Sequence, residues 1–172
     1  MYAIQGSLPP AEGTLLIRGD DVYSYPPAER VFFQRHVMGI IFQSFNLIGS
    51  LSVLDNVALP MIFCDANKST RERRAQQLLD RFGVGQVSHK IPSMLSGGQQ
   101  QRVSVARSMV NDPQILLADE PTGNLDSVST KQVMDKIDEI NTFDQRTIIM
   151  VSHNAAHLSY AHRVYYLKDG FI

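Results

Sequence analysis

The sequence predicts an α/β fold in which a mostly parallel sheet carries an inserted helical subdomain. Short apolar runs at residues 38–42, 115–118 and 147–151 are typical of buried strands, and helical stretches separate them. Strands that alternate with helices favour a parallel sheet covered on both faces. We therefore expect a single domain, 1–172, with an α/β core lobe formed by residues 1–43 and 111–172 and a helical lobe formed by residues 44–110.

Composition narrows the class of protein before any motif is considered. The chain has 172 residues, of which 44% are hydrophobic and 19% are charged, as expected for one globular domain. The formal net charge of −1 argues against a broad nucleic-acid face, and we expect no nucleic-acid partner. Cys64 is the single cysteine, which excludes a disulfide framework within the chain and a cysteine-based zinc cluster.

The first part of the core lobe is expected to hold two strands and a helix. Residues 14–18 are predicted to form a short strand, and Pro26 and Pro27 are suited to the first turn of the helix that follows. Residues 38–42 then form a buried strand, and Gln43 stands at its carboxyl end.

The helical lobe is predicted from capping patterns and apolar spacing. Ser69 and Glu72 have the spacing of a capping box, and so do Ser96 and Gln99 further along. After the first of these caps, four apolar residues recur at helical spacing and form one stripe: Ala75, Leu78, Leu79 and Phe82.

The last part of the core lobe alternates again between strands and a helix. Residues 115–118 are predicted to form a buried strand, and residues 127–140 a helix with one apolar face. Residues 147–151 and 164–167 are predicted to be two further strands.

Two adjacent carboxylates, Asp119 and Glu120, follow one of these buried strands. In open α/β sheets, ligands bind beyond the carboxyl ends of the strands. One carboxylate there can hold Mg²⁺, usually through water, and the other can orient and deprotonate an attacking water. The alternative is a solvated pair at a strand end, but the Pro-Thr-Gly-Asn-Leu-Asp run at residues 121–126 favours a functional site.

Other polar residues gain meaning from their order in the chain. The run Ser96-Gly97-Gly98-Gln99 opens a predicted helix, where free N–H groups and two glycines can receive a phosphate. It is also compatible with a plain helix cap. His153 and Gln43 each follow a strand, and each taken alone is more often a structural or surface residue.

One expected element of a nucleotide site is missing from these residues. None of the eleven glycines belongs to a G-x-x-x-x-G-K-[ST] phosphate loop. Lys68-Ser69-Thr70 imitates the end of such a loop, but no glycine precedes it closely and no strand leads into it. We expect Ser69 to cap a helix instead.

Taken together, these residues resemble an ABC transporter nucleotide-binding subunit. The resemblance rests on Leu-Ser-Gly-Gly-Gln-Gln-Gln-Arg at residues 95–102, on Ile-Leu-Leu-Ala-Asp-Glu at 115–120, and on the runs at 41–48 and 118–127. The last two runs are similar to the ATPases of lipoprotein-release, macrolide-export and cell-division-type systems. The resemblance covers nearly the whole chain and implies a P-loop NTPase (ABC ATPase) core.

The resemblance implies ATP and Mg²⁺ as ligands and a role for each catalytic residue. Gln43 senses Mg²⁺ and the γ-phosphate, and Asp119 supports the metal. Glu120 acts on the attacking water, and His153 contacts the γ-phosphate.

The resemblance further implies a second ATPase subunit, as a homodimer or a heterodimer. In the family, two such domains sandwich two ATP molecules, and Asp126 links the two sites. The residues expected to contact the ATP bound to the opposite subunit are Ser96, Gly97, Gly98 and Gln99.

A membrane partner is also implied. Transmembrane permease subunits are expected to dock on the helical lobe, where four apolar residues lie close together: Phe45, Leu47, Ile48 and Leu51. The subunit is then cytoplasmic and peripheral on the inner face of the cell membrane, and powers export or lipoprotein release.

The first residues of the chain depart from the family pattern. Family members begin with antiparallel strands, an adenine-stacking aromatic residue and the phosphate loop, whereas residues 1–6 resemble the helix that follows this loop. We therefore expect an N-terminally incomplete chain. The alternative is a non-enzymatic degenerate subunit, or gene remnant, that offers only its signature face to an intact partner. A DNA-repair ATPase is disfavoured because the insert between Gln43 and Ser96 is short.

Overall fold

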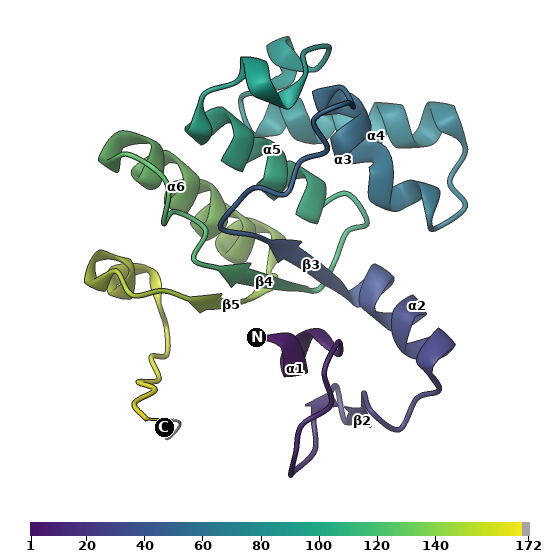
Figure 1. The fold of residues 1–172 in the computed structure, drawn as a ribbon, viewed down its shortest axis with the longest axis vertical. Coiled ribbons are helices and arrows are strands. Elements are labelled where there is room, and N and C mark those ends of the chain that lie inside the picture. The colour runs from purple at the N-terminus through teal and green to yellow at the C-terminus, as the bar shows by residue number, and fades with distance from the viewer. Residues whose placement is uncertain (170–172) are drawn as a thin grey trace.

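A three-stranded parallel sheet lies at the centre of the computed structural model, which describes residues 1–169. Its strands are β3 (Met38–Ile41), β4 (Ile115–Asp119) and β5 (Thr147–Val151), in the order β3-β4-β5. Both pairs are parallel, with Ile41 opposite Ala118 and Asp119 opposite Val151. The carboxyl ends of the three predicted strands therefore meet at one edge of the sheet (Figure 1).

The first predicted strand is shorter than expected and lies outside this sheet. β1 (Leu16–Ile17) pairs antiparallel with β2 (Asp20–Asp21). Arg18 and Gly19 between them have φ angles of 57° and 89°, so the chain turns back before a five-residue strand can form.

A long helix packs on one face of the sheet, and a short helix lies near part of the other face. α6 (Ser127–Asp144) packs on one face, and the short α1 (Tyr2–Gln5) lies near the other (Figure 1). Successive side chains of β4 point to opposite faces of the sheet and contribute to two apolar clusters. Leu116 belongs to the large core cluster, and Leu117 belongs to a smaller one with Ile17 and Met38. α2 (Pro27–Val37) begins at a proline, as predicted, and runs directly into β3.

The helical lobe is built from three helices, α3 (Val53–Ile62), α4 (Lys68–Arg81) and α5 (Gly97–Ser108). Two short 3₁₀ turns, η1 (Gly85–Val87) and η2 (Pro92–Met94), connect the last two of these helices. The predicted apolar stripe is confirmed, since its four members are all at most 2% exposed: Ala75, Leu78, Leu79 and Phe82.

The predicted cap of α4 is wrong. The N-cap is Asn67, two residues earlier than Ser69, and its side chain accepts a hydrogen bond from the Thr70 amide at 2.9 Å. Ser69 instead donates its hydroxyl to Asn67 at 2.9 Å. Asn and Ser are both good caps, so the Ser-x-x-Glu spacing alone did not identify the true helix start.

The two predicted lobes share packed side chains. One large cluster of buried residues includes Val53 and Phe82 from the helical lobe together with Leu116 and Ile140 from the core lobe. The position of α5 is therefore coupled by direct packing to the sheet that carries the candidate site.

The end of the described chain departs from prediction. After β5 the chain forms a 3₁₀ helix, η3 (Ala155–Tyr160), and residues 164–167 form no strand. These residues are 42–73% exposed. An apolar run forms a strand only where a neighbouring strand pairs with it. Among residues 1–169, none of the helices has the length and apolar character required to cross a membrane.

Candidate functional site

Asp119 and Glu120 lie where β4 leaves the sheet. Asp119 is the last residue of the strand, and the Glu120 amide donates to the Val151 carbonyl on β5 at 3.0 Å. Glu120 has a φ of 43°, which is uncommon for a residue with a side chain. Such backbone strain persists only where the surroundings fix the conformation, and it concentrates at functional sites.

Gly123 allows Gln43 to approach this strand end. The Gly123 amide donates to the Glu120 carbonyl at 3.0 Å and closes a tight turn. A Cβ atom on Gly123 would lie 2.7 Å from Nε2 of Gln43 and 3.3 Å from Oε2 of Glu120. The Gln43 amide and the Glu120 carboxylate, 77 positions apart in the chain by their numbers, therefore lie beside the same glycine.

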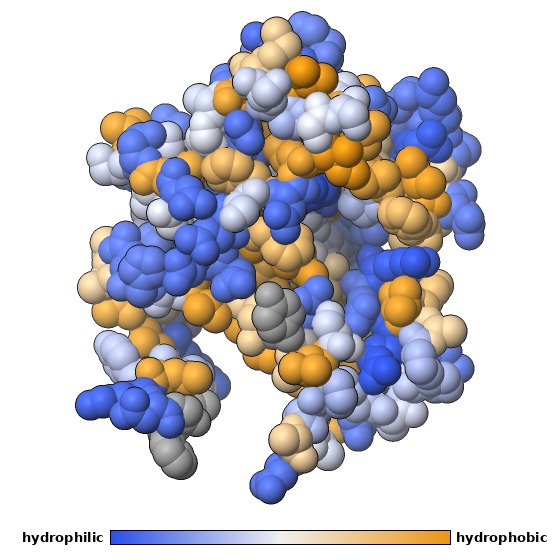
Figure 2. Space-filling model, in the orientation of Figure 1, coloured by the Kyte–Doolittle hydropathy of each residue, from blue (hydrophilic) through white to orange (hydrophobic). Residues whose placement is uncertain are grey.

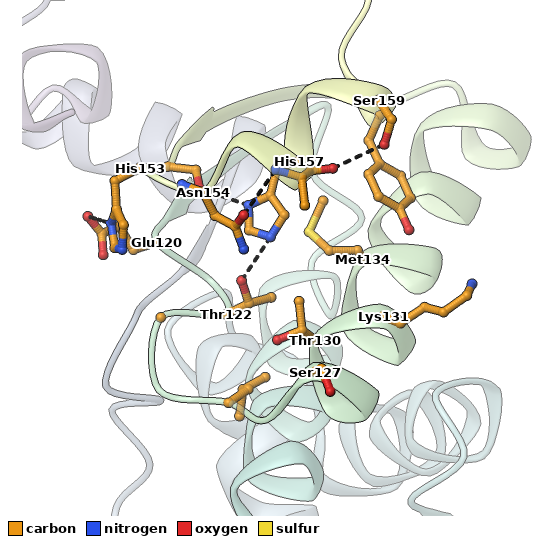
Figure 3. Close-up of a pocket in the computed structure, with 15 residues that line it drawn as sticks. Glu120, Thr122, Ser127, Thr130, Lys131, Met134, His153, Asn154, His157 and Ser159 are labelled. Atoms are coloured by element: carbon orange, nitrogen blue, oxygen red, sulfur yellow. Dashed lines mark hydrogen bonds and ion pairs between the residues drawn. The ribbon is translucent and has the colours of Figure 1, made fainter.

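His153 completes the group at this edge. Its Nδ1 lies 2.9 Å from Oε1 of Glu120, and the side chains are 75% and 27% exposed respectively (Figure 3). A contact this exposed contributes little to folding stability. The contact brings the imidazole and the carboxylate together at a surface open to a ligand.

The remaining candidate ligand of Mg²⁺ is Asp119, which is half-buried at the end of β4. Among the described residues there is no cluster of three or more His, Cys, Asp or Glu side chains able to hold a metal by themselves. Mg²⁺ in phosphoryl-transfer sites is commonly held by one or two carboxylates together with waters and substrate phosphates. A single carboxylate such as Asp119, at the same edge of the sheet as Gln43, fits that kind of site.

The signature residues form the amino terminus of α5. Ser96 accepts a hydrogen bond from the Gln99 amide at 3.3 Å, and Gln99 accepts one from the Ser96 amide at 3.0 Å, so the predicted capping box is confirmed. A Cβ on Gly98 would lie 2.5 Å from Oγ of Ser129, and a Cβ on Gly97 would contact Leu125 at 3.5 Å. The two glycines therefore also allow the start of α5 to pack against the start of α6.

Asp126 is the N-cap of α6. Its carboxylate accepts hydrogen bonds from the Ser129 amide at 2.9 Å and from the Ser129 hydroxyl at 2.8 Å. These bonds favour the ionised form, the one from the Ser129 amide most, and lower the pKa of Asp126. The structure thus gives Asp126 a clear local function as a cap, and places it on the same segment as Glu120.

Comparison with known protein families identifies the family of this chain. The family model described as ABC transporter matches residues 1–123, which is more than half of the chain. The chain belongs to the ABC transporter family. Members of this family are ATPases that couple ATP hydrolysis to transport.

Relatives of known sequence agree with this assignment. An uncharacterized ABC transporter ATP-binding protein of Methanocaldococcus jannaschii, MJ1508, is 44% identical over 163 residues, which is 95% of this chain and 72% of the relative. The macrolide export ATP-binding/permease protein MacB of an Azoarcus species is 41% identical over 163 residues. That match covers 95% of this chain but 25% of the relative, so the chain spans about a quarter of the length of MacB.

Solved structures confirm the predicted fold class. A dimeric post-hydrolysis structure of the ATP-binding cassette MJ0796, bound to ADP and Pi, has a TM-score of 0.87 at 35% identity and covers 98% of this chain and 75% of that one. A second dimeric MJ0796 structure has a TM-score of 0.88 at 36% identity. The α/β P-loop NTPase core with a parallel sheet is therefore the fold of this ABC ATPase chain.

Sequence reasoning missed a buried amide beside the site. Gln101 is fully buried on α5, and its Nε2 donates to the Pro121 carbonyl at 2.6 Å and to the Phe42 carbonyl at 3.2 Å. No local pattern singles out Gln101, because its i+3, i+4 and i+7 neighbours on the predicted helix are Ser104, Val105 and Ser108. Its two partners lie in segments far away in the sequence.

His157 was missed as well. It is 5% exposed, with Nε2 at 3.2 Å from the Thr122 hydroxyl and Nδ1 at 2.7 Å from the Ser152 hydroxyl (Figure 3). Burial, and then the nearby charge of His153, lower the pKa of His157. The imidazole joins the segment after β4 to the segment after β5, along one wall of a cleft of about 570 Å³ bounded by α6 and η3.

Proposed function

We propose that this chain is the ATP-binding and ATP-hydrolysing part of an ABC transporter of the macrolide-export and lipoprotein-release branch. The observation that carries the proposal is the convergence of Glu120, Gln43 and His153 at the carboxyl edge of the sheet. The likeness to MacB, which is named as a macrolide exporter, supports the choice of branch.

Each residue at the sheet edge has a part in the proposed hydrolysis. Asp119 and the amide oxygen of Gln43 would hold Mg²⁺, which would neutralise charge on the phosphates. Glu120 accepts a proton from the attacking water as that water approaches the γ-phosphate. His153 contacts the γ-phosphate, and its neighbour Glu120 at 2.9 Å sets the direction of the ring.

The signature residues serve a second subunit in this proposal. The start of the 12-residue helix α5 presents backbone N–H groups and a partial positive charge, both suited to a phosphate. We propose that Ser96, Gly97, Gly98 and Gln99 contact ATP held by the opposite subunit. The dimeric MJ0796 structures support a paired arrangement. We propose that Asp126 links the two sites in such a pair.

The test of Glu120 needs a chain that binds ATP firmly. Residues 1–172 contain no phosphate loop, so we define a loop-completed chain as these residues preceded by a strand and a Gly-x-x-x-x-Gly-Lys-Ser loop. In it, Glu120→Gln keeps ATP binding, because the amide has the same shape, but slows turnover about 10²–10⁴-fold, since it takes no proton. The trapped ATP also makes a dimer accumulate on gel filtration.

The control for this experiment is Glu139→Gln, the same change at a residue of α6 that pairs with Lys136. This variant keeps normal turnover. Near-normal hydrolysis by Glu120→Gln contradicts the proposed role of Glu120, even if ATP still binds.

The chain of 172 residues by itself is expected to bind Mg-ATP only weakly and to release no phosphate. Asp119, Gln43 and His153 contact only the Mg²⁺ and γ-phosphate end, whereas a phosphate loop supplies most of the backbone N–H contacts. Calorimetric titration with Mg-ATP measures this. Micromolar affinity with steady phosphate release contradicts it, and also contradicts the alternative of a non-enzymatic subunit that offers only its signature face.

The proposed permease contact lies on the helical lobe next to Gln43. Ile48 is 42% exposed, whereas Phe45, Leu47 and Leu51 are half-buried and Leu47 packs against the large core cluster. Figure 2 shows apolar surface on this lobe beside a hollow. At the other end of α3, Phe63 is 56% exposed, and its carbonyl accepts a hydrogen bond from Arg35 of α2 at 3.2 Å.

A substitution at the exposed member tests this contact without disturbing the core. Ile48→Asp is expected to abolish co-purification with the membrane subunit, because a carboxylate opposes an amphipathic helix that docks through its apolar face. Phe143→Asp is the control, since Phe143 is 76% exposed on α6 away from this surface. Equal retention of both variants rules the surface out. A permease contact of this kind places the chain on the cytoplasmic face of the membrane.

A further inference from the structure

Gln101 joins three segments that the proposed mechanism uses separately. Its side chain comes from α5, one helical turn after Gly97, and donates to the carbonyls of Phe42 and Pro121. Phe42 immediately precedes Gln43, and Pro121 immediately follows Glu120. One amide group from the signature helix therefore holds the backbone beside both catalytic side chains.

The chemistry of Gln101 indicates why an amide stands at this position. The residue is fully buried, and its Oε1 has no hydrogen-bond partner among the described residues. An unpaired buried oxygen destabilises the folded state, and an apolar residue of the same size avoids that loss. What an apolar residue lacks is the pair of N–H donors, and both donors are engaged.

The two carbonyls need an outside donor because of where they lie. Each belongs to a residue at which the backbone has just left the ladder of a strand, β3 in one case and β4 in the other. Buried backbone carbonyls are almost always paired. Pro121 also follows Glu120, whose left-handed φ of 43° persists only if neighbouring contacts fix it.

We propose that Gln101 is a positioning residue that fixes Glu120 and Gln43 relative to each other and to the signature helix. It touches neither ATP nor the attacking water. Its effect passes through the backbone at Phe42 and Pro121. The importance of this effect for hydrolysis rests on the proposed function, whereas the positioning itself does not involve a nucleotide.

The first test uses the unchanged chain and observes the side-chain NH₂ group of Gln101 by NMR. Both of its protons are expected to exchange with solvent at least about tenfold more slowly than those of Gln86, which is exposed, because both donors are buried and bonded. Exchange as fast as that of Gln86 overturns the proposal. This NMR measurement tests the proposal even if every variant of Gln101 fails to fold.

The second test removes the donors. Gln101→Met keeps a similar volume, and is expected to speed hydrogen exchange of the Glu120 and Gly123 backbone amides about tenfold and to shift their resonances. Val103→Ala is the matched control, since Val103 is fully buried on the same helix and its truncation lowers global stability without touching either carbonyl.

A second control tests whether the loss of any side-chain amide on α5 speeds exchange of the Glu120 and Gly123 backbone amides. Gln100→Met removes a side-chain hydrogen bond of 3.2 Å to Leu95, within the helical lobe. The proposal expects the Glu120 and Gly123 amides to remain unchanged in this variant. It is overturned if Gln101→Met leaves these amides unchanged, or if Val103→Ala at equal stability changes them as much. Because no nucleotide is added, a failure of ATP binding leaves these outcomes readable.

Discussion

The two loops that bring Glu120 and Gln43 together are held in different ways. The loop at residues 120–123 is fixed from inside the protein. Pro121 and Thr122 are buried, the Glu120 and Gly123 amides are both hydrogen-bonded, and the Pro121 carbonyl accepts from Gln101. Thr122 is further held by His157.

The loop at residues 43–47 is held by two side chains from outside it. Asn124 donates to the Gln43 carbonyl at 3.3 Å, and Arg107 holds the residues that follow. Gln43 and Asn46 are exposed, and the carbonyls of Phe45 and Asn46 accept hydrogen bonds from the Arg107 guanidinium at 2.8 and 2.5 Å. Phe45 and Asn46 have φ angles of 57° and 49°. Burial lowers the pKa of Arg107, but the group remains charged at neutral pH.

Buried amides stand at both ends of this second loop. Gln101 holds Phe42 before it, and Asn56 holds Ile48 after it through the backbone N–H at 2.7 Å and the carbonyl at 3.0 Å. The difference between the loops indicates a division of labour. The proposed general base stands on a loop held by buried contacts, whereas Gln43 stands on a largely exposed loop held by Arg107 and Asn124. We therefore expect the Gln43 loop to be the more adaptable of the two.

The largest expected loss of stability comes from removing the far anchor. Asn56 is fully buried and also donates to the carbonyls of Leu51 and Ser52. Asn56→Ala is expected to lower the free energy of unfolding by about 3 kcal/mol, because several buried backbone groups lose their partner at once. Urea denaturation measures the loss. As a control, Asn67→Ala removes one exposed helix cap and costs about 1 kcal/mol.

A smaller loss is expected from releasing the loop between its anchors. Arg107→Met leaves the Phe45 and Asn46 carbonyls without their charged donor, and costs about 2 kcal/mol. The same variant is expected to speed hydrogen exchange in residues 44–46 while leaving the amides of Glu120 and Gly123 unchanged. A parallel change in both loops means that they form one unit, against the division proposed above.

A methyl group at Gly123 tests which of the two loops gives way. A Cβ there meets the end of the flexible Gln43 side chain at 2.7 Å, so Gly123→Ala is expected to move Gln43 and to cost less than about 1 kcal/mol. Gly39→Ala is the contrasting variant, because its Cβ meets the Ser108 backbone carbonyl at 2.2 Å and Leu116 at 2.6 Å. That change is expected to cost about 1–3 kcal/mol. Equal losses in thermal or urea unfolding contradict this reading.

The smallest expected effect is the contribution of His157 to the pH dependence of folding stability. Because burial lowers the pKa of His157 in the folded chain, the unfolded chain binds a proton more readily, near the ordinary value of about 6.5. The contribution of His157 is therefore fully present above that pH and is lost as the pH falls through it. His157→Gln is expected to flatten the dependence of stability on pH between about 7 and 5. His89→Gln, at an exposed position, leaves the slope unchanged.

The strands of the sheet could be predicted because their signal is local. The apolar runs at 38–42, 115–118 and 147–151 match β3, β4 and β5 to within one residue. The run at 164–167 has the same local character but forms no strand, since pairing depends on a neighbour. Apolar residues thus indicate a strand, and only tertiary contacts decide whether it forms.

The candidate site was predictable in its residues and not in its supports. The order of the motifs implies that Gln43, Glu120 and His153 converge, and the parallel register supplies the geometry for it. The supporting contacts of Gln101 and Arg107 join positions about 20 to 62 apart in sequence, and no local period encodes them. The roles in ATP hydrolysis stay predictions until turnover is measured.

The most direct measurement of the central claim is hydrogen exchange in the unchanged chain, followed amide by amide. The claim is that the Glu120 loop is fixed and the Gln43 loop is adaptable. It predicts that the Glu120 and Gly123 amides are protected at least about tenfold more strongly than those of residues 44–46. Equal protection of the two loops, or stronger protection of residues 44–46, would contradict the account.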